Sequence, residues 1–308
     1  MQNAQPQHAP SAPLVYLVVL NWNGFDDSHE CLQSLGRLAY PRYRLLVVDN
    51  GSSDDSAERL VHEHPEIEIV RCAENHGIAA GYNRGIEQAY ARGADYVVVM
   101  NNDLVFDPAF LSHMVAVCRG FPDCGIVMPK IYYYDEPNII WAAGAYPRWM
   151  ASNIVMRGYQ RPDGPEYGRI ETIEFAPSCC LLLTRELVEQ VAFDEHYFFY
   201  YDDWDFCVQA RNAGKRLVFA ADAKIWHKVS RSTLNSPSSL RWWKILGQSC
   251  ARYHRKHHTT RLLFTYVAWV LFRETVKGNI RSMPTFVAGV VAGLKARTIE
   301  DTRPGWSA

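Results

Sequence analysis

The segment Tyr96–Phe106 (YVVVMNNDLVF) constrains the fold of this chain more than any other stretch. A short apolar run rich in β-branched residues predicts a strand buried on both faces, as in a parallel sheet. The run ends in Asn101, Asn102 and Asp103, at the edge of an open α/β sheet where ligands bind. A carboxylate such as that of Asp103 is the ligand type that Mg²⁺ and Mn²⁺ prefer. The alternative is a polar exit from the strand, since Asn and Asp favour turns.

Further apolar runs precede this segment and also end in polar residues. They predict strands at 14–20, 45–48 and 67–71, alternating with helices at 26–38, 57–64 and about 78–92. Strands and helices that alternate with short connections predict a parallel, three-layer α/β/α sheet with right-handed crossovers. The polar loops 21–24 (NWNG), 49–56 (DNGSSDDS) and 101–103 then share one edge, where a nucleotide would bind.

Two common nucleotide motifs are missing from the sequence. No GxGxxG follows the first predicted strand, which argues against a dinucleotide site, and no GxxxxGK[ST] occurs, which excludes a P-loop. Beyond residue 120 the pattern becomes irregular, with aromatic residues and turns at 128–136, 141–154 and 160–168. A loop-rich aromatic half opposite a nucleotide edge suits acceptor binding, although aromatic core and turns explain any one of these residues equally well.

Three aspartates, Asp202, Asp203 and Asp205, lie within four positions at the predicted start of a helix. Helix capping accounts for one of them but not for three. The surrounding aromatic residues would desolvate these carboxyls and raise their pKa towards the value that a general base needs. Further on, His227 ends an apolar strand beside Lys228, a setting that suits a metal or a diphosphate.

Composition bounds the size and class of the protein. With 308 residues, 48% of them hydrophobic and 21% charged, the chain is long enough for one large α/β domain and an appendage. Its eight cysteines show no CxxC or zinc spacing, as expected for reduced, buried thiols of a cytosolic protein. Residues 1–13 are polar and Pro-rich without a basic start, which predicts a disordered leader and not a signal peptide.

The charge is unevenly distributed, because residues 240–297 hold eleven Lys and Arg but a single acid, Glu274. The apolar run Leu262–Phe272 within them is too short to span a bilayer. Basic residues beside interfacial Trp predict a helix on an anionic membrane surface and a peripheral location on the cytoplasmic face of the cell membrane. The alternative is a helix pair packed on the catalytic domain. Nucleic acid is disfavoured, because the charges adjoin an apolar helix.

Taken in order, these segments resemble the family-two glycosyltransferases, in particular their rhamnosyltransferase-like branch. The matching motifs are VVLNWNG (18–24), VVDNGSSDDS (47–56), ENHGIAAGYNRGI (74–86), MNNDLVFDP (100–108), FDEHYFFYYDDWDFCVQARNAGKRL (193–217) and IWHKVSRST (225–233). The resemblance implies a GT-A fold over 14–235, with a nucleotide-sugar half (14–107) and an acceptor-binding and catalytic half (108–235), followed by a basic helical region (236–308). It also implies Mg²⁺ or Mn²⁺ as cofactor and inverting transfer of a sugar from a nucleotide-diphosphate donor.

The same resemblance assigns residue roles. It implies Asp203 as catalytic base with Asp202 beside it, Asp103 and His227 as metal ligands, and Asp49 as the base-recognising carboxylate. The remaining donor-binding residues are expected to be Asn21, Asn23, Asp54, Asn75, Gly77, Asn83 and Asn102, and the acceptor-binding residues Tyr201 and Trp204. One departure is Asn101, which replaces the first Asp of the family's Asp-X-Asp motif. Metal binding is therefore expected to depend more on the donor diphosphate.

The expected reaction moves one L-rhamnose from dTDP-β-L-rhamnose to a glycan or polyprenyl-linked acceptor in cell-surface polysaccharide synthesis. The QxxRW signature of processive synthases is absent, since Ser238 stands where its Gln would be, so a single addition is expected. Three alternatives remain at this point: a UDP- or GDP-sugar donor, a nucleotidyltransferase, and a catalytically silent glycan-binding homologue. The loop after the first strand lacks the Lys or Arg that a nucleotidyltransferase needs.

Overall fold

The computed structural model describes residues 12–148, 153–229 and 240–296. Most of the leader, the end of the 225–233 motif, Ser238 and Arg297 lie outside the described residues. The elements of the first half are β1 (Val15–Asn21), α1 (Phe25–Leu35), β2 (Tyr43–Asp49), α2 (Ser56–Glu63), β3 (Glu68–Arg71), α3 (Ile78–Ala91), β4 (Tyr96–Asn101) and β5 (Leu104–Phe106). The alternation predicted through residue 106 is confirmed.

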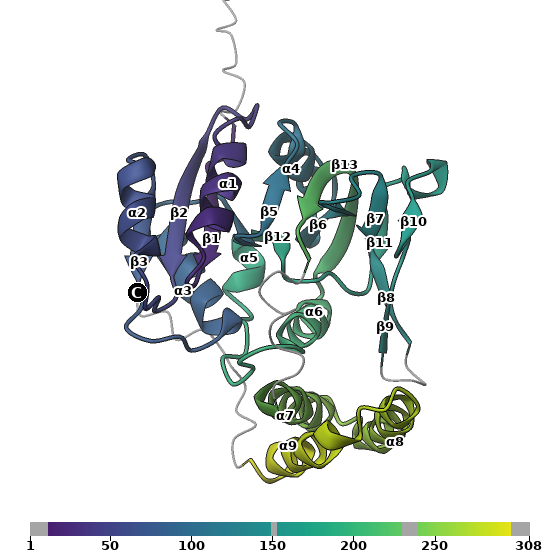
Figure 1. Cartoon of the computed structure of the whole chain (residues 1–308). Helices are drawn as coiled ribbons and strands as arrows, with labels where there is room; N and C mark the ends of the chain where they lie inside the picture. The colour runs from purple at the N-terminus through teal and green to yellow at the C-terminus, as the bar shows by residue number, and fades with distance from the viewer. Residues whose placement is uncertain (1–11, 149–152, 230–239, 297–308) are drawn as a thin grey trace, which may run out of the picture.

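Strand β1 is the centre of the parallel half of the sheet, whose strands run in the order β3-β2-β1-β4 (Figure 1). All seven residues of β1 are buried, so both of its faces are covered. In the register of the sheet Asn21 pairs with Asp49, and Leu20 pairs with Asn101. The carboxyl ends of β1, β2 and β4 therefore meet at one edge, as the sequence predicted.

The second half is a mixed sheet with shorter helices. Its elements are α4 (Phe110–Gly120), β6 (Cys124–Tyr133), β7 (Ile139–Ala142), β8 (Ala145–Arg148), β9 (Asn153–Met156), β10 (Arg161–Pro162), β11 (Glu171–Ile173), β12 (Cys180–Thr184), α5 (Arg185–Val188), α6 (Asp202–Asn212) and β13 (Arg216–His227). Strand β12 runs antiparallel to both β4 and β6, and β13 runs parallel to β6. The antiparallel β12 thus joins the nucleotide half to the acceptor half in one continuous sheet.

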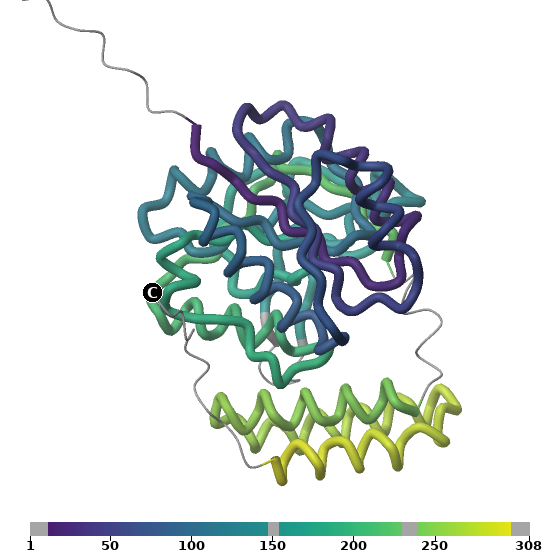
Figure 2. Tube along the Cα trace, turned by 90° about the vertical axis from the view of Figure 1, so that its left-hand side faces the viewer, coloured from purple at the N-terminus to yellow at the C-terminus, as the bar shows by residue number. Residues whose placement is uncertain are grey.

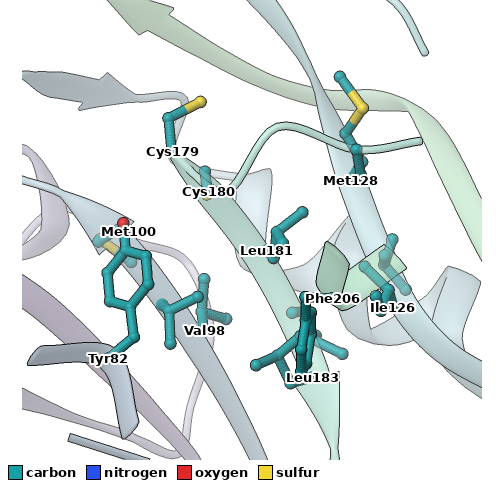
Figure 3. Close-up of a cluster of buried hydrophobic side chains, with 14 of the residues drawn as sticks. Tyr82, Val98, Met100, Ile126, Met128, Cys179, Cys180, Leu181, Leu183 and Phe206 are labelled. Carbon is teal, nitrogen blue, oxygen red and sulfur yellow. The ribbon is translucent and has the colours of Figure 1, made fainter. Parts of the chain in front are cut away.

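Apolar residues of β4, β12 and β6 form the core at this junction (Figure 3). Val98, Leu181 and Ile126 come from the three neighbouring strands and are fully buried. Tyr82 of α3 and Phe206 of α6 also pack into this cluster (Figure 3). The core therefore fixes α6 against the same strands that carry the polar edge.

The segment Tyr96–Phe106 forms two strands, which its polar residues separate. Strand β4 ends at Asn101 and β5 begins at Leu104, so Asn102 and Asp103 lie in the break between them. Strand β5 leaves β4 and pairs antiparallel with β13, with Leu104 opposite His227. The polar residues break the strand because their side chains make hydrogen bonds outside the ladder, which favours a turn.

Three C-terminal helices form a separate layer below the sheet domain: α7 (Leu240–Lys256), α8 (Thr260–Val276) and α9 (Met283–Lys295) (Figures 1 and 2). Helices α7 and α9 approach closely, because a Cβ added at Gly247 would lie 2.3 Å from the carbonyl oxygen of Phe286, and one at Gly289 would lie 2.2 Å from that of Lys244. Helix α7 lies against α6. The predicted helical C-terminal region is present, and among the described residues no helix is both long and apolar enough to cross a membrane.

Candidate active site

The ends of β1 and β2 form a buried hydrogen-bonded cluster at the polar edge. The Asn21 amide donates to Oδ1 of Asp49 at 3.1 Å and to the hydroxyl of Ser56 at 3.1 Å, and its oxygen accepts from Ser28 at 2.8 Å. Asn21 has no exposed surface, and its side chain orients Asp49. Its predicted place in the donor-binding site stays a prediction.

Asp49 itself is 5% exposed, and its Oδ1 also accepts from the Ser52 hydroxyl at 2.5 Å. The neighbouring loops are joined by Asn23, whose Oδ1 accepts from the backbone N–H of Ser53 at 2.8 Å. Asp54 stays exposed and accepts from the backbone N–H of Ser56 at 3.1 Å, at the start of α2. Two of the predicted donor residues thus have defined structural roles in shaping the loop around Asp49.

The loop before α3 contacts both this cluster and the segment that precedes α6. Nδ2 of Asn50 donates to the carbonyl of Gly77 at 3.0 Å, and Oδ1 of Asn75 accepts from the Gly77 N–H at 2.9 Å. Gly77 has φ +98°, and a Cβ there would lie 2.5 Å from the carbonyl oxygen of Phe198. Only glycine satisfies both the backbone angle and this close approach.

Asn83 lies away from the polar edge. Its amide nitrogen donates to the carbonyl of Phe193 and to Glu195, both at 2.9 Å, and its oxygen accepts from the Phe193 N–H at 3.1 Å. Both amide atoms therefore tie α3 to the segment before α6. The prediction of Asn83 as a donor-binding residue stays a prediction, and in this structure its amide is engaged by Phe193 and Glu195.

Asp103 and His227 meet at the break between β4 and β5. Nε2 of His227 lies 3.2 Å from Oδ2 of Asp103, and the side chains are 9% and 11% exposed respectively. The ring of Trp141 contacts His227 edge-on at 5.1 Å. Asn102, the next predicted donor residue, donates to the Ser28 hydroxyl at 2.8 Å and so fastens this corner to α1.

The protonation of this pair is strongly coupled. Burial opposes the charge of His227, yet the neighbouring Asp103 outweighs it and raises the pKa of the imidazole to about 10. Burial would also raise the pKa of Asp103, but His227 holds it below the ordinary carboxyl value. Near neutral pH the imidazole is therefore protonated and paired with the ionised Asp103, and a divalent cation that binds the imidazole would displace its proton.

The residues of this pair fit a divalent cation. Oδ1 of Asp103 is buried and has no hydrogen-bond partner among the described residues, although a buried carboxylate oxygen is rarely left unpaired. Carboxylate and imidazole are both ligands of Mn²⁺-type ions. The described residues contain no cluster of three His, Cys, Asp or Glu, so a cation here would need further ligands from a bound diphosphate and water.

Two consecutive residues with positive φ deliver the second pair of carboxylates. Tyr200 and Tyr201 have φ values of 62° and 66°, which bulky residues rarely adopt, immediately before α6 begins at Asp202. Burial raises the pKa of Asp202 to about 6. Burial, and then the charge of Asp202, raise the pKa of Asp203 to about 8. Such a pKa suits a general base near neutral pH.

One short segment links the two carboxylate sites. The Tyr82 hydroxyl donates to Oδ1 of Asn101 at 2.8 Å and to the carbonyl of Ser178 at 3.0 Å. The Asn101 N–H donates to the carbonyl of Cys179 at 2.9 Å, and the Ser178 hydroxyl donates to Asp202 at 3.2 Å. Residues 178 and 179 therefore hold the Asp103 corner and the Asp202 corner within one site. The Asn101 oxygen takes part in this link.

Tyr201 and Trp204 do not line an open surface. Their rings stack on each other at 5.7 Å, and Trp204 packs on Tyr253 of α7 at 4.7 Å. The two side chains are only 8% and 4% exposed. Helix α7 covers both rings through Tyr253, so their predicted role as acceptor contacts stays a prediction that would require α7 to move.

Sequence reasoning missed several residues of the site. The serines at 52, 56 and 178 donate to acidic side chains, and Ser28 donates to the Asn21 oxygen; only the SSDDS run signalled any of them. In the sequence Lys228 stands out only as a basic neighbour of His227. In the structure its ammonium lies 2.5 Å from Asp27 and 2.7 Å from Glu30 of α1. No periodicity in the sequence reveals such pairs, because their members lie far apart along the chain.

The mixed sheet has the GT-A fold of glycosyltransferases. The chain belongs to glycosyl transferase family 2, whose family model matches residues 16–191. The protein is thus an inverting glycosyltransferase, as the resemblance implied. The match ends before Asp202, Asp203 and His227, so these assignments depend on the structure.

Named relatives agree with this family. An N-acetylglucosaminyl-diphospho-decaprenol L-rhamnosyltransferase from Mycobacterium tuberculosis is 27% identical over 221 residues, which cover 63% of this chain and 69% of that protein. The low-salt glycan biosynthesis hexosyltransferase Agl10 of Haloferax volcanii is 21% identical over 197 residues, or 63% of this chain and 61% of that protein. The resemblance to the rhamnosyltransferase-like branch of the family is therefore confirmed.

Solved structures share the fold. The mannosyltransferase PcManGT from Pyrobaculum calidifontis, in complex with GDP-Man and Mn²⁺, has a TM-score of 0.56 at 15% identity and covers 93% of this chain and 88% of that one. GalNAc-T7 with UDP, GalNAc and Mn²⁺ has a TM-score of 0.59 at 12% identity, covering 81% and 51%. These likenesses confirm the predicted GT-A fold.

Proposed function

We propose that this enzyme transfers a single L-rhamnose from dTDP-β-L-rhamnose to a glycan or polyprenyl-linked acceptor in cell-surface polysaccharide synthesis. The observation that carries the reaction is the pair of acidic corners, Asp103–His227 and Asp202–Asp203, held in one site by residues 178 and 179. The name of the mycobacterial relative supports the choice of sugar and of a lipid-linked acceptor. UDP- and GDP-sugars remain the alternative donors.

The nucleotide would lie along the edge formed by β1, β2 and the loop before α3. Asp49, fixed by Asn21 and Ser52, would recognise the base, and the loop carrying Asn75 and Gly77 would close one side. Asp103 and His227 would hold Mg²⁺ or Mn²⁺ beside the diphosphate. When bound, that cation supplies neutralisation of the charge that grows on the leaving phosphate.

Asp203 would act as the catalytic base. Its raised pKa lets it accept the proton of an acceptor hydroxyl while that oxygen attacks the anomeric carbon opposite the nucleotide. A single displacement of this kind inverts the anomeric centre, so a β-linked donor gives an α-linked product. Asp202 would support it, because the Ser178 hydroxyl fixes its carboxylate at the start of α6.

We further propose that the C-terminal helices dock on a membrane surface, mainly through apolar side chains. The sequence suggested an electrostatic contact, but several of the basic residues are used inside the protein: Arg252 and Lys256 pair with Asp194, Arg255 donates to the Gly293 carbonyl, and Arg273 pairs with Glu274. Helix α8 and the turn after it expose large apolar side chains: Phe264, Phe272, Val276 and Ile280 are 60 to 71% exposed.

The charges around this apolar face favour a lipid surface as its partner. Exposed Arg261, Lys277 and Arg281 flank the apolar residues, and Glu274, the acid of this region, is buried. A second copy of the chain would bring these cations together, whereas anionic lipid headgroups would neutralise them. An acceptor carried on a polyprenyl diphosphate would then lie at the same surface.

A donor panel tests the proposed function. Purified protein is mixed with dTDP-rhamnose, UDP-GlcNAc or GDP-mannose, with and without Mn²⁺, and release of nucleotide diphosphate is measured. We expect slow, cation-dependent hydrolysis of dTDP-rhamnose above the other two. Faster turnover of another donor would replace the sugar assignment. No turnover of any donor, combined with binding of glycan alone, would favour the silent glycan-binding alternative.

A further inference from the structure

The segment that carries the catalytic carboxylates is bounded by two other aspartates, and both are completely buried. Asp194 precedes the segment and Asp205 follows it on α6, and neither has exposed surface. Buried carboxylates are costly unless they are paired. The sheet domain supplies His196, whose ring lies 2.9 Å from Asp194, and the Gln209 amide, which donates to Asp205 at 2.7 Å. The Lys and Arg partners come from α7 of the C-terminal region, so the permanent positive charges that neutralise these carboxylates lie outside the sheet domain.

Asp194 is held from two turns of α7. Arg252 donates from Nε to Oδ2 at 3.1 Å and from Nη2 to Oδ1 at 3.2 Å, a contact with both oxygens that fixes the carboxylate plane. Lys256 reaches the same Oδ2 at 3.1 Å. Burial would raise the pKa of Asp194, but these cations hold it below the ordinary value, so the group stays charged.

Asp205 is held by the same helix. Lys256 lies 2.8 Å from its Oδ2, and His257 lies 2.8 Å from its Oδ1. The Lys256 ammonium therefore bridges a carboxylate on each side of Asp202 and Asp203. Between these ends, the Ser249 hydroxyl donates to the carbonyl of Phe199 at 3.0 Å.

We propose that Lys256 is a positioning residue for the catalytic base, and that α7 is a structural part of the active site. By joining Asp194 to Asp205, the ammonium holds both ends of the span that contains Tyr200 and Tyr201 in their strained conformation. That strain persists only where surrounding contacts impose it. The inference rests on the proposed role of Asp203.

Lys256 also acts through charge. The charge of Asp205 raises the pKa of Asp202, which in turn raises that of Asp203. Removing the ammonium would leave Asp205 less neutralised and would raise the pKa of the catalytic pair further. The titratable or charged groups facing the pair include Tyr82 of α3, Tyr200 before α6, Asp205 and Cys207 of α6 and, behind them, Asp194 and His196, Arg252 and Lys256 of α7, and His257, which follows α7.

The test compares full-length Lys256→Met with Lys256→Arg and with Lys244→Met, which removes an exposed lysine from the same helix. Donor hydrolysis of dTDP-rhamnose, dTDP affinity and the carboxyl pKa of Asp203, from ¹³C NMR titration, are measured for each. We expect Lys256→Met to cut turnover at least tenfold, leave dTDP affinity within threefold and move the Asp203 pKa upward. Lys256→Arg should recover most turnover, and Lys244→Met should match the wild type.

Unchanged turnover and an unchanged Asp203 pKa in Lys256→Met would overturn the proposal. If Lys256→Met does not fold, Ser249→Ala replaces it, because this change loosens the same span without leaving an unpaired charge. A drop in its turnover with dTDP affinity retained supports the proposal, and wild-type turnover overturns it. Wild-type protein that turns over no dTDP-rhamnose would refute the proposed donor, while the NMR titration still decides the role of Lys256.

Discussion

Nε2 of His227 lies 3.2 Å from Oδ2 of Asp103, although the two residues are far apart in the sequence. The pairing of β5 with β13 creates this contact, because Asp103 immediately precedes β5 and His227 ends β13. The other oxygen of Asp103 is buried and has no hydrogen-bond partner among the described residues. The two residues are therefore an ion pair that offers too few ligands to complete a metal site, and a cation that binds His227 must displace its imidazole proton.

Metal binding should accordingly depend on nucleotide. We expect calorimetry to detect weak Mn²⁺ binding to the free protein and much tighter binding when dTDP is present, because two protein ligands alone do not fill the coordination shell. Asp103→Ala should abolish the nucleotide-dependent component. Full turnover in excess EDTA, or metal-dependent turnover that survives Asp103→Ala, would contradict the assignment.

Asp203→Asn should slow the reaction by a factor of ~10² to 10⁴, the usual contribution of a general base, and leave donor binding within a few-fold. The amide keeps the shape of the side chain but accepts no proton. Steady-state turnover and dTDP affinity are compared for Asp203→Asn, Asp202→Asn and Asp205→Asn. Near-normal turnover in Asp203→Asn together with loss of turnover in Asp202→Asn would identify Asp202 as the catalytic base.

Turnover should rise with pH through a pKa well above that of an ordinary carboxyl. Asp203 must be ionised to accept a proton, and burial together with Asp202 raises its pKa to about 8. Below this pH the base is protonated and the rate falls, and above it the rate levels off. The pH profile of turnover with saturating donor measures this. A profile that is already flat at pH 6 would show that the pKa of the catalytic base is not raised.

Gly77→Ala should destabilise the protein more than Gly93→Ala. Both glycines have positive φ, +98° and +84°, but a Cβ at residue 77 would collide with Phe198 whereas nothing lies within 4 Å of one at residue 93. The backbone penalty is about 1–2 kcal/mol at either site. The extra loss in Gly77→Ala, measured by urea unfolding, reports the collision. Equal losses would show that the loop moves aside freely.

Binding to liposomes should resist salt. Insertion of Phe264 and Phe272 contributes about 1.5–3 kcal/mol each if fully buried, and salt does not screen this apolar contribution. In flotation assays with anionic vesicles, Phe264→Ser combined with Phe272→Ser should release the protein. Val61→Ser, at an exposed apolar residue of α2, is the control. Binding that is lost in high salt would instead support a purely electrostatic contact. If the protein binds no vesicle, the exposed apolar face would be better explained as a contact with another copy of the chain.

The sequence by itself determined the parallel half of the fold and the location of the polar edge. Local patterns suffice there, since β-branched runs such as that of β1 form buried strands and the polar residues that end them necessarily lie at the carboxyl end. The motif around Asp202 and Asp203 also pointed to a base, because three acids among aromatics exceed what helix capping needs.

Only the tertiary structure decided which polar residues are engaged by hydrogen bonds inside the fold. Asn21 and Asn83 match the family pattern as well as Asp49 does, yet burial and completed hydrogen bonds assign the two amides structural roles. It also decided where the C-terminal charges go: Arg252 and Lys256 neutralise aspartates of the sheet domain. The physical reason is that desolvation and ion pairing depend on which surfaces meet, and residue spacing along a chain does not contain that information.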